Sequence, residues 1–156
     1  MMKDESMFEA VRAQLSHAVP YAVHTGVEIL AVDAGEARAR LVEQPHTLNH
    51  VGSQHAGALF TLAEAASGAA MVGAFLPRMA SMRPLAASAS IDYLAVARGT
   101  IEATARIDGD AAALQATLDQ EGRVRFPVTV ELADETGRSV ARVTVDWHLK
   151  SLAEAA

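Results

Sequence analysis

The segment HAGALFTLAEAASGAAMVGAFL, His55 to Leu76, decides the fold of this chain. It is apolar apart from a thin seam of polar residues, and Glu64 is its only charged residue. About 20 apolar residues can cross a membrane, but this run is mostly Ala and Gly and carries a carboxylate near its middle. A helix that is apolar nearly all round is otherwise buried in protein. We therefore expect a central helix over residues 54–76 and no membrane partner.

Composition limits the class of protein. The 156 residues are 51% hydrophobic and 21% charged, which suits one globular domain with a sizeable core. A net charge of -6 and 4% aromatic residues lack the basic surface and the stacking platform of a nucleic-acid-binding protein. The absence of cysteine excludes disulfides, thiolate metal sites and a cysteine nucleophile. The acidic segment MMKDESMFEAVRAQL is unlike a signal peptide, so we expect a cytoplasmic protein.

The flanking segments predict strands and one covering helix. Apolar residues at helical spacing over 4–18, followed by Pro20, indicate a helix within an N-terminal extension of residues 1–24. Two-residue alternation then predicts two strands before the central helix, between residues 27 and 41, and four after it. Residues 109–123 resemble an inserted loop with a helical turn or two, and Pro127 predicts an edge strand or a bulge.

The predicted fold class is therefore α+β. One domain over residues 25–152 would hold an antiparallel curved sheet of about six strands, wrapped around the central helix because its apolar faces need a cover.

The start of the central helix offers free backbone amides. Ser53 is the expected N-cap, which leaves the N–H groups near His55, Ala56 and Gly57 without intrahelical acceptors at the positive end of the helix dipole. Such amides can stabilise an oxyanion.

A polar stripe runs along the same helix. Thr61, Glu64 and Ser67 are spaced by three and so share a face. A carboxylate base or nucleophile, a pair of free amides and the nearby Asn49 are the groups that acyl transfer to water requires. Glu64 would either activate a water molecule or attack the thioester itself to give a mixed anhydride, and the sequence does not separate the two.

The run NHVGSQHAGALFTLAEAASG, residues 49–68, resembles the signature of the PaaI-like hotdog thioesterases. In that family an Asn, a Gly and a HisGlyGly turn precede a helix that carries an Asp or Glu. The segment IDYLAVARG resembles the strand and turn that follow the helix. The resemblance covers about residues 25–150. It implies a hotdog fold, a homodimer or dimer of dimers, and hydrolysis of an acyl-CoA or related thioester, with no cofactor beyond the coenzyme A of the substrate.

The resemblance also implies roles for single residues. Glu64 matches the catalytic carboxylate, Asn49 the residue that orients water or the thioester, and His55 the first residue of the turn. Ala56 matches the Gly whose N–H forms the oxyanion hole, and Gly57 the Gly after it. Ala in place of Gly excludes backbone geometry that only Gly reaches, although an N–H in helical conformation would survive.

Further residues are candidates for substrate binding. In some members a Ser or Thr helps the carboxylate, and Ser88 and Ser90 are the candidates for that role here. The predicted substrate-binding set is Thr61, Ser67, Ser88, Ser90 and Arg98. Arg78, Arg83 and Arg106 also lie in or near turns, where a cation could meet the phosphates of coenzyme A.

The spacing of the two catalytic elements predicts a dimer. Ala56 and Glu64 are eight residues apart, or about 12 Å along a helix, so one thioester carbonyl cannot easily be reached by both. If both act together, two central helices must meet antiparallel, with Ala56 and Asn49 of one chain facing Glu64 of the other.

Other interpretations stay open at this point. Glu64 could be a buried neutral acid in a structural network, Asn49 a turn residue and His55 a cap. A non-catalytic acyl-CoA-binding module is one alternative function. A hotdog hydratase or dehydratase is another, although acyl-carrier dehydratases have a Gln where this chain has Gly68. The spacing of His46, His50 and His148 matches no ligand pattern, so no metal is expected.

Overall fold

The computed structural model describes residues 2–152, with side chains from residue 4 onward. Six strands form one antiparallel sheet in the order β1-β2-β4-β5-β6-β3, which confirms the predicted number of strands. The elements in chain order are α1 (Met2–Ala18), α2 (Pro20–Thr25), β1 (Val27–Asp33), β2 (Glu36–Leu41), α3 (Ala56–Phe75), β3 (Met82–Tyr93), β4 (Ile101–Ile107), α4 (Ala111–Glu121), β5 (Arg123–Ala133) and β6 (Ser139–Ser151).

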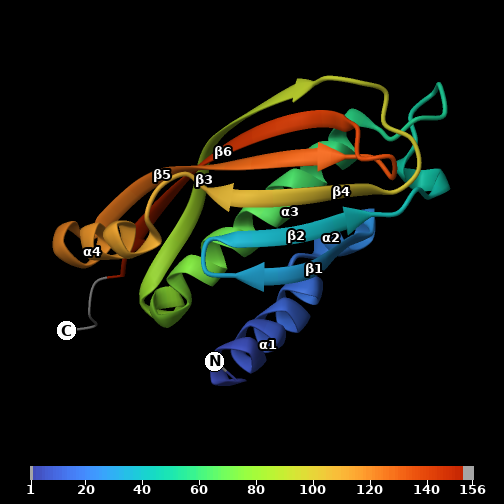
Figure 1. The fold of residues 1–156 in the computed structure, drawn as a ribbon. Coiled ribbons are helices and arrows are strands. Elements are labelled where there is room, and N and C mark those ends of the chain that lie inside the picture. The colour runs from blue at the N-terminus through green and yellow to red at the C-terminus, as the bar shows by residue number, and fades with distance from the viewer. Residues whose placement is uncertain (1, 153–156) are drawn as a thin grey trace.

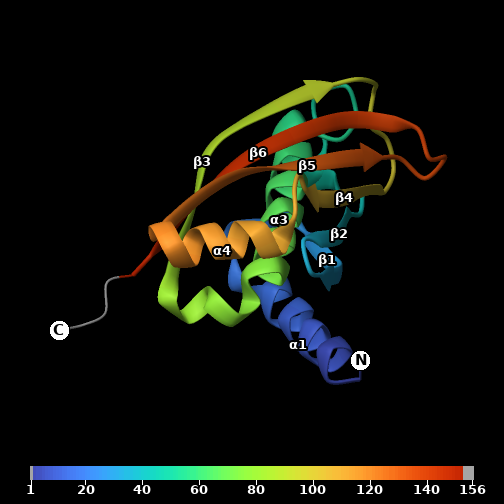
Figure 2. The same cartoon turned by 60° about the vertical axis from the view of Figure 1, so that its left-hand side comes forward.

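Helix α3 is the centre of the fold, as the sequence predicts. The sheet curves around it, and it contacts β1, β2, β4, β5 and β6 (Figures 1 and 2). It begins at Ala56 and ends at Phe75, two residues later and one residue earlier than predicted, and a 3₁₀ turn over Leu76–Ser81 follows. A long helix enclosed by a curved antiparallel sheet is the hotdog arrangement, so the predicted fold class is confirmed.

The apolar run Ala56–Ser81 is long and apolar enough to cross a membrane by composition alone, with a mean hydropathy of 1.6. In this structure 67% of the 18-residue apolar stretch within this run is buried inside the protein, as expected of the core helix of a globular domain.

Gly73 sets how closely α3 approaches the sheet. A Cβ built on Gly73 would lie 2.0 Å from the carbonyl oxygen of Asp33, at the end of β1. No side chain fits at this crossing, so the glycine lets the helix and the strand touch.

The N-terminal extension contains two helices where the sequence predicts one. Helix α1 ends at Ala18, and Pro20 then opens α2 at its first position, where proline needs no hydrogen-bond acceptor for its nitrogen. Helix α1 packs on β1, and the Arg12 guanidinium donates to the carbonyl of Ile29 at 3.2 Å. One edge of the sheet is therefore covered.

The other edge, β3, is bare. Every residue from Leu85 to Ser90 is exposed, and this run contains only Leu, Ala and Ser. Natural edge strands are usually protected by charges, bulges or a covering element, because unpaired N–H and C=O groups invite another strand. Strand β3 has a bulge near Ala87 but no charge between residues 84 and 91.

Two smaller predictions need correction: the helix within residues 109–123 is longer than the predicted turn or two, and the strand that holds Pro127 is not at an edge. Residues 111–121 form an eleven-residue helix, α4, capped by the Asp110 side chain, which accepts from the N–H of Ala112. Pro127 lies in an interior strand, between β4 and β6. The proline is tolerated because the β4–β5 ladder ends at the pair of Ile107 and Val128. Pro127, the residue before Val128, lies beyond that last pair, so no backbone N–H toward β4 is needed there.

Candidate active site

The start of α3 has a different cap from the one expected. His55 is the N-cap, and its Nδ1 accepts the N–H of Gly57 at 2.8 Å. Ser53 lies instead in the preceding loop. The Gly57 amide is therefore occupied, whereas the Ala56 N–H has no acceptor among the described residues. The His55 N–H is also occupied, since it donates to the Thr47 carbonyl at 2.7 Å, so of the three expected amides only that of Ala56 remains free at the positive end of the helix dipole among the described residues.

Asn49 organises the loop before α3. Its Oδ1 accepts the N–H groups of Val51 and Ser53 at 3.0 and 3.1 Å, and its Nδ2 donates to the Ser53 hydroxyl at 2.8 Å. Both polar ends of the side chain are used locally, which is the turn-forming role of the alternative interpretation. Within the described part of the chain, no hydrogen bond joins Asn49 to Glu64 of the same chain.

Glu64 is half-buried on α3, and burial raises the pKa of its carboxyl above the ordinary value. No hydrogen bond or ion pair to its carboxylate occurs among residues 4–152. A carboxylate that is partly removed from water without a partner is energetically costly and tends to hold its proton. A raised carboxyl pKa of this kind, next to a cavity, is typical of a group that accepts and releases a proton in a reaction.

Glu64 opens onto a cavity of about 280 Å³. Its walls come from α1 and α2, from β1 and from two turns of α3, and Pro84 and Trp147 line it from the sheet. Among the described lining residues Glu64 is the only charged one. The cavity thus places an isolated carboxylate against an apolar space.

The hydroxyls of the polar stripe are used inside the protein. Thr61 Oγ1 donates to the Gly57 carbonyl at 2.8 Å, and Ser67 Oγ donates to the Glu64 carbonyl at 2.7 Å. Ser67 is fully buried and also accepts from Trp147 Nε1 at 3.2 Å. Thr61 and Ser67 therefore stabilise α3 and its contact with β6, and neither hydroxyl is free for substrate in this conformation.

Ser88 and Ser90, the candidates to help the carboxylate, face away from α3. Residues that pair across antiparallel strands share a face of the sheet, and Ala86 pairs with Trp147 on the face that α3 covers. Unbroken alternation would put both serines on that face too. An extra residue between Ala86 and Ser88 reverses the alternation, so Ser88 pairs with the outward-facing Asp146.

The predicted phosphate-binding arginines are mostly engaged elsewhere. Arg98 donates to the Gly52 carbonyl at 3.1 Å and so ties two loops together. Arg78 pairs with Asp119, and Arg106 pairs with Glu36.

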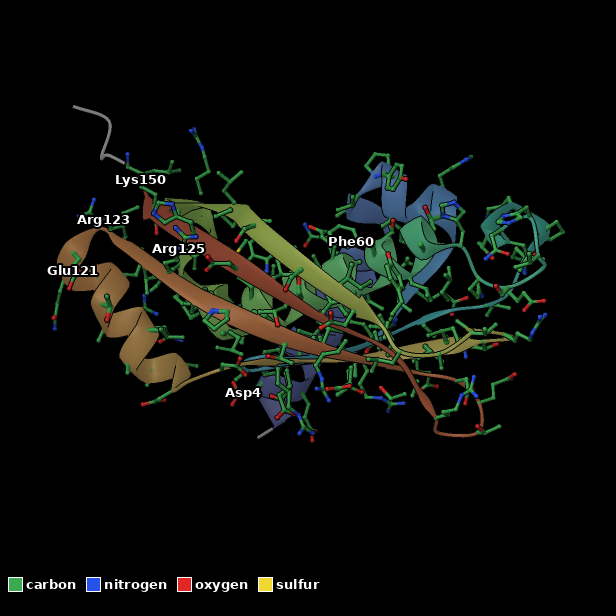
Figure 3. All side chains as sticks on the ribbon, turned by 90° about the horizontal axis from the view of Figure 1, so that it is seen from above. Asp4, Phe60, Glu121, Arg123, Arg125 and Lys150 are labelled. Atoms are coloured by element: carbon green, nitrogen blue, oxygen red, sulfur yellow. The ribbon has the colours of Figure 1, made fainter. Side chains whose placement is uncertain are left out.

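Arg83 belongs to a row of cations. It lies opposite Lys150, which lies opposite Arg123, and no ion pair of the described residues involves any of the three. Figure 3 shows Lys150 and Arg123, with the neighbouring Arg125, at the end of the sheet next to α4, far from Phe60 of the central helix.

Sequence reasoning missed two residues near the site. Trp147 lines the cavity, and Tyr93 donates from its hydroxyl to the Ala56 carbonyl at 3.1 Å, which fixes the end of β3 to the start of α3. The alternation of β6 places Trp147 on the inner face, but its hydrogen-bond partner is 80 residues away and could not be read from the sequence. No cluster of three possible metal ligands occurs in the described chain.

The chain belongs to a protein family described as a domain of unknown function, DUF4442, whose model matches residues 8–149. No curated protein matches this chain. Among solved structures it is similar to PA5026 of Pseudomonas aeruginosa, a protein of unknown function described as a probable thioesterase. The identity is 28% and the TM-score 0.80, over 92% of this chain and 95% of that chain.

Two more distant structures share the fold. The PaaI protein of Escherichia coli, from the phenylacetic acid degradation operon, is 22% identical with a TM-score of 0.69, over 90% of this chain and 94% of that chain. A hypothetical thioesterase of Streptococcus pneumoniae, solved with coenzyme A, is 19% identical with a TM-score of 0.65, over 83% of this chain and 91% of that chain. The resemblance to the PaaI-like hotdog fold seen in the sequence is confirmed.

Proposed function

We propose that this protein hydrolyses acyl thioesters, with acyl-CoA as the substrate class, and that two copies of the chain share each active site. The observation that carries the proposal is Glu64, an unpartnered carboxylate with a raised pKa on the wall of an apolar cavity. The probable thioesterase of P. aeruginosa supports the reaction class, and the S. pneumoniae structure with coenzyme A supports the substrate class.

In the proposed reaction Glu64 acts as a general base. It removes a proton from a water molecule whose oxygen attacks the thioester carbonyl carbon, and the carbonyl oxygen becomes an oxyanion. The free N–H of the partner's Ala56 would hold that oxyanion. Collapse of the intermediate breaks the C–S bond, and the proton on Glu64 passes to the departing thiolate. A thiolate leaves easily, so no strong general acid is needed.

The helix geometry supports sharing of the site. Ala56 and Glu64 lie on one helix, about 12 Å apart along its axis, so we expect the two groups that would meet one carbonyl to come from two copies. The bare edge of β3 supports the same arrangement, since an uncharged edge strand of small residues can pair with a second copy of itself. The exposed Ala56 and Gly57 would permit close approach of the second helix.

Thiol release from acyl-CoA substrates tests the function, and the chain has no cysteine that would react with the thiol reagent. We expect Glu64→Gln to lower kcat by about 100-fold to 10,000-fold, the range of a lost general base. Glu121→Gln, at an exposed glutamate on α4, is the matched control and should keep full activity. Unchanged turnover in Glu64→Gln would reject the catalytic assignment. Binding of acyl-CoA by the wild type without any turnover would favour the non-catalytic module.

A further inference from the structure

We infer that the cavity beside Glu64 binds the acyl chain of the thioester as an apolar aliphatic chain of about nine carbons, and that helices α1 and α2 set this length. The identity of the reacting bond rests on the proposed function, whereas binding of the chain does not require turnover.

The chemistry of the lining selects an apolar occupant. Apart from Glu64, the polar side chain on the wall is that of Ser16, whose hydroxyl already donates to the Arg12 carbonyl at 2.9 Å. The rest of the wall is apolar, with Val19, Val72 and Trp147 among its residues. A nucleotide, a hydroxylated chain or a second carboxylate would lose its hydrogen bonds to water here without replacement. An alkyl chain would gain from leaving water.

The volume and the lining of the cavity are consistent with one capacity. The cavity holds about 280 Å³, and a group of methylene or water size takes about 30 Å³, so about nine such groups fit. Along α3 the lining runs from Glu64 to Val72, eight residues or about 12 Å. With C–C bonds of about 1.5 Å an extended alkyl chain advances about 1.3 Å per carbon, so about nine carbons span that length.

The outer wall of the cavity belongs to the N-terminal extension. Leu15 belongs to α1, Val19 is the residue between α1 and α2, and Val23 belongs to α2. These residues close the side of α3 that the sheet leaves free. Val19 and Val23 remain 50% and 45% exposed, so this wall leaves apolar surface for a ligand to cover. The extension therefore decides how long a chain can be enclosed beside Glu64.

A chain-length series tests the inference kinetically. From butyryl-CoA upward, each methylene that enters the cavity should raise kcat/KM by about threefold to fourfold, until the rise ends near nine carbons. Val72→Phe fills the far end and should lower the ratio of kcat/KM for decanoyl-CoA to kcat/KM for butyryl-CoA at least about tenfold. Val96→Phe, at an exposed valine outside the cavity, is the matched control. A flat series, a maximum at acetyl-CoA or preference for phenylacetyl-CoA would overturn the inference.

A binding measurement separates this inference from the proposed function. Trp147, the single tryptophan of the chain, lies on the cavity wall, so its fluorescence reports occupancy directly. In the Glu64→Gln variant, decanoyl-CoA should bind at least about tenfold more tightly than butyryl-CoA and change Trp147 emission. Val72→Phe in that background should abolish the difference. Equal binding of coenzyme A and decanoyl-CoA would overturn the inference even if thioesters are hydrolysed. Chain-dependent binding without turnover would support it while rejecting the proposed function.

Discussion

Trp147 and Ser67 are joined by a buried hydrogen bond of 3.2 Å from the indole Nε1 to the hydroxyl, which in turn donates to the Glu64 carbonyl. The link fastens the turn of α3 that carries Glu64 to strand β6. Ser67→Ala should lower the free energy of unfolding by about 1 to 3 kcal/mol, because it leaves the buried indole N–H without an acceptor. Urea unfolding measures this change.

The control is the double variant with Trp147→Phe, which removes both partners of the bond. The double variant should lose less free energy of unfolding than the two single variants lose together, because no unpaired donor is left. Additive losses would contradict the coupling.

Glu64 makes stability depend on pH in a specific direction. Since burial raises the pKa of its carboxyl in the folded state, the proton is held more tightly there than in the unfolded chain. Tighter binding of this proton stabilises the folded state below the ordinary pKa of 4.5, and the stabilisation is lost as pH rises through the raised pKa. Glu64→Gln should therefore raise Tm relative to wild type at about pH 8, and the gain should vanish toward about pH 4.

Thermal unfolding at several pH values measures the effect of Glu64. If the carboxylate is the base, kcat/KM of the wild type should also rise with pH through the same raised pKa. A Tm difference between Glu64→Gln and the wild type that stays constant with pH would contradict the burial assigned to Glu64.

Two glycines of α3 should respond in opposite ways to the same change. Gly73→Ala would place a methyl group 2.0 Å from the Asp33 carbonyl oxygen, which is backbone and cannot move aside cheaply, so we expect a loss of about 3 kcal/mol or more. Gly68→Ala meets Trp147 at an ordinary 3.5 Å and should gain up to about 1 kcal/mol from helix propensity. Urea unfolding of both variants provides the comparison. Similar effects at the two positions would argue against the close crossing of α3 and β1.

A charge on the bare edge should weaken the proposed dimer. In a two-fold pairing of β3 with its copy, lysines introduced at Ser88 would repel each other near the axis. We expect Ser88→Lys to shift the protein toward the monomer in light scattering and to lower thioesterase activity in parallel. Ser139→Lys, at an exposed serine outside β3, should do neither. A fully active Ser88→Lys monomer would reject the shared active site.

The row of Arg83, Lys150 and Arg123 should be a source of repulsion, because like charges directly opposite each other destabilise a sheet. Lys150→Glu converts two repulsive neighbours into attractive ones and should stabilise the fold by about 0.5 to 1 kcal/mol, or about 1 to 3 °C in Tm. Lys150→Gln should gain less. The gain should shrink in high salt, where exposed charges are screened, and its absence in low salt would contradict the repulsion.

Periodicity was sufficient to predict the main elements of this fold. The apolar run with Glu64 predicts a buried central helix, and two-residue alternation predicts the six strands. Both patterns can be read from the sequence because side-chain directions within one helix or strand follow from residues close along the chain. The same local reasoning predicted α3 to within two residues but underestimated the length of α4, whose low amphipathicity leaves little periodic signal. It also singled out Glu64 as the residue to explain.

The sequence by itself thus determined the class of fold, the buried helix and its isolated carboxylate, since these depend on neighbours close along the chain. Only the tertiary structure decided which face Ser88 and Ser90 occupy, because one bulge residue reverses the alternation of a strand without any local signal. It also decided that His55 occupies the Gly57 amide, that Trp147 meets Ser67, and that α1 and α2 wall a cavity beside Glu64. Contacts between distant segments depend on how whole elements pack, which no local pattern records.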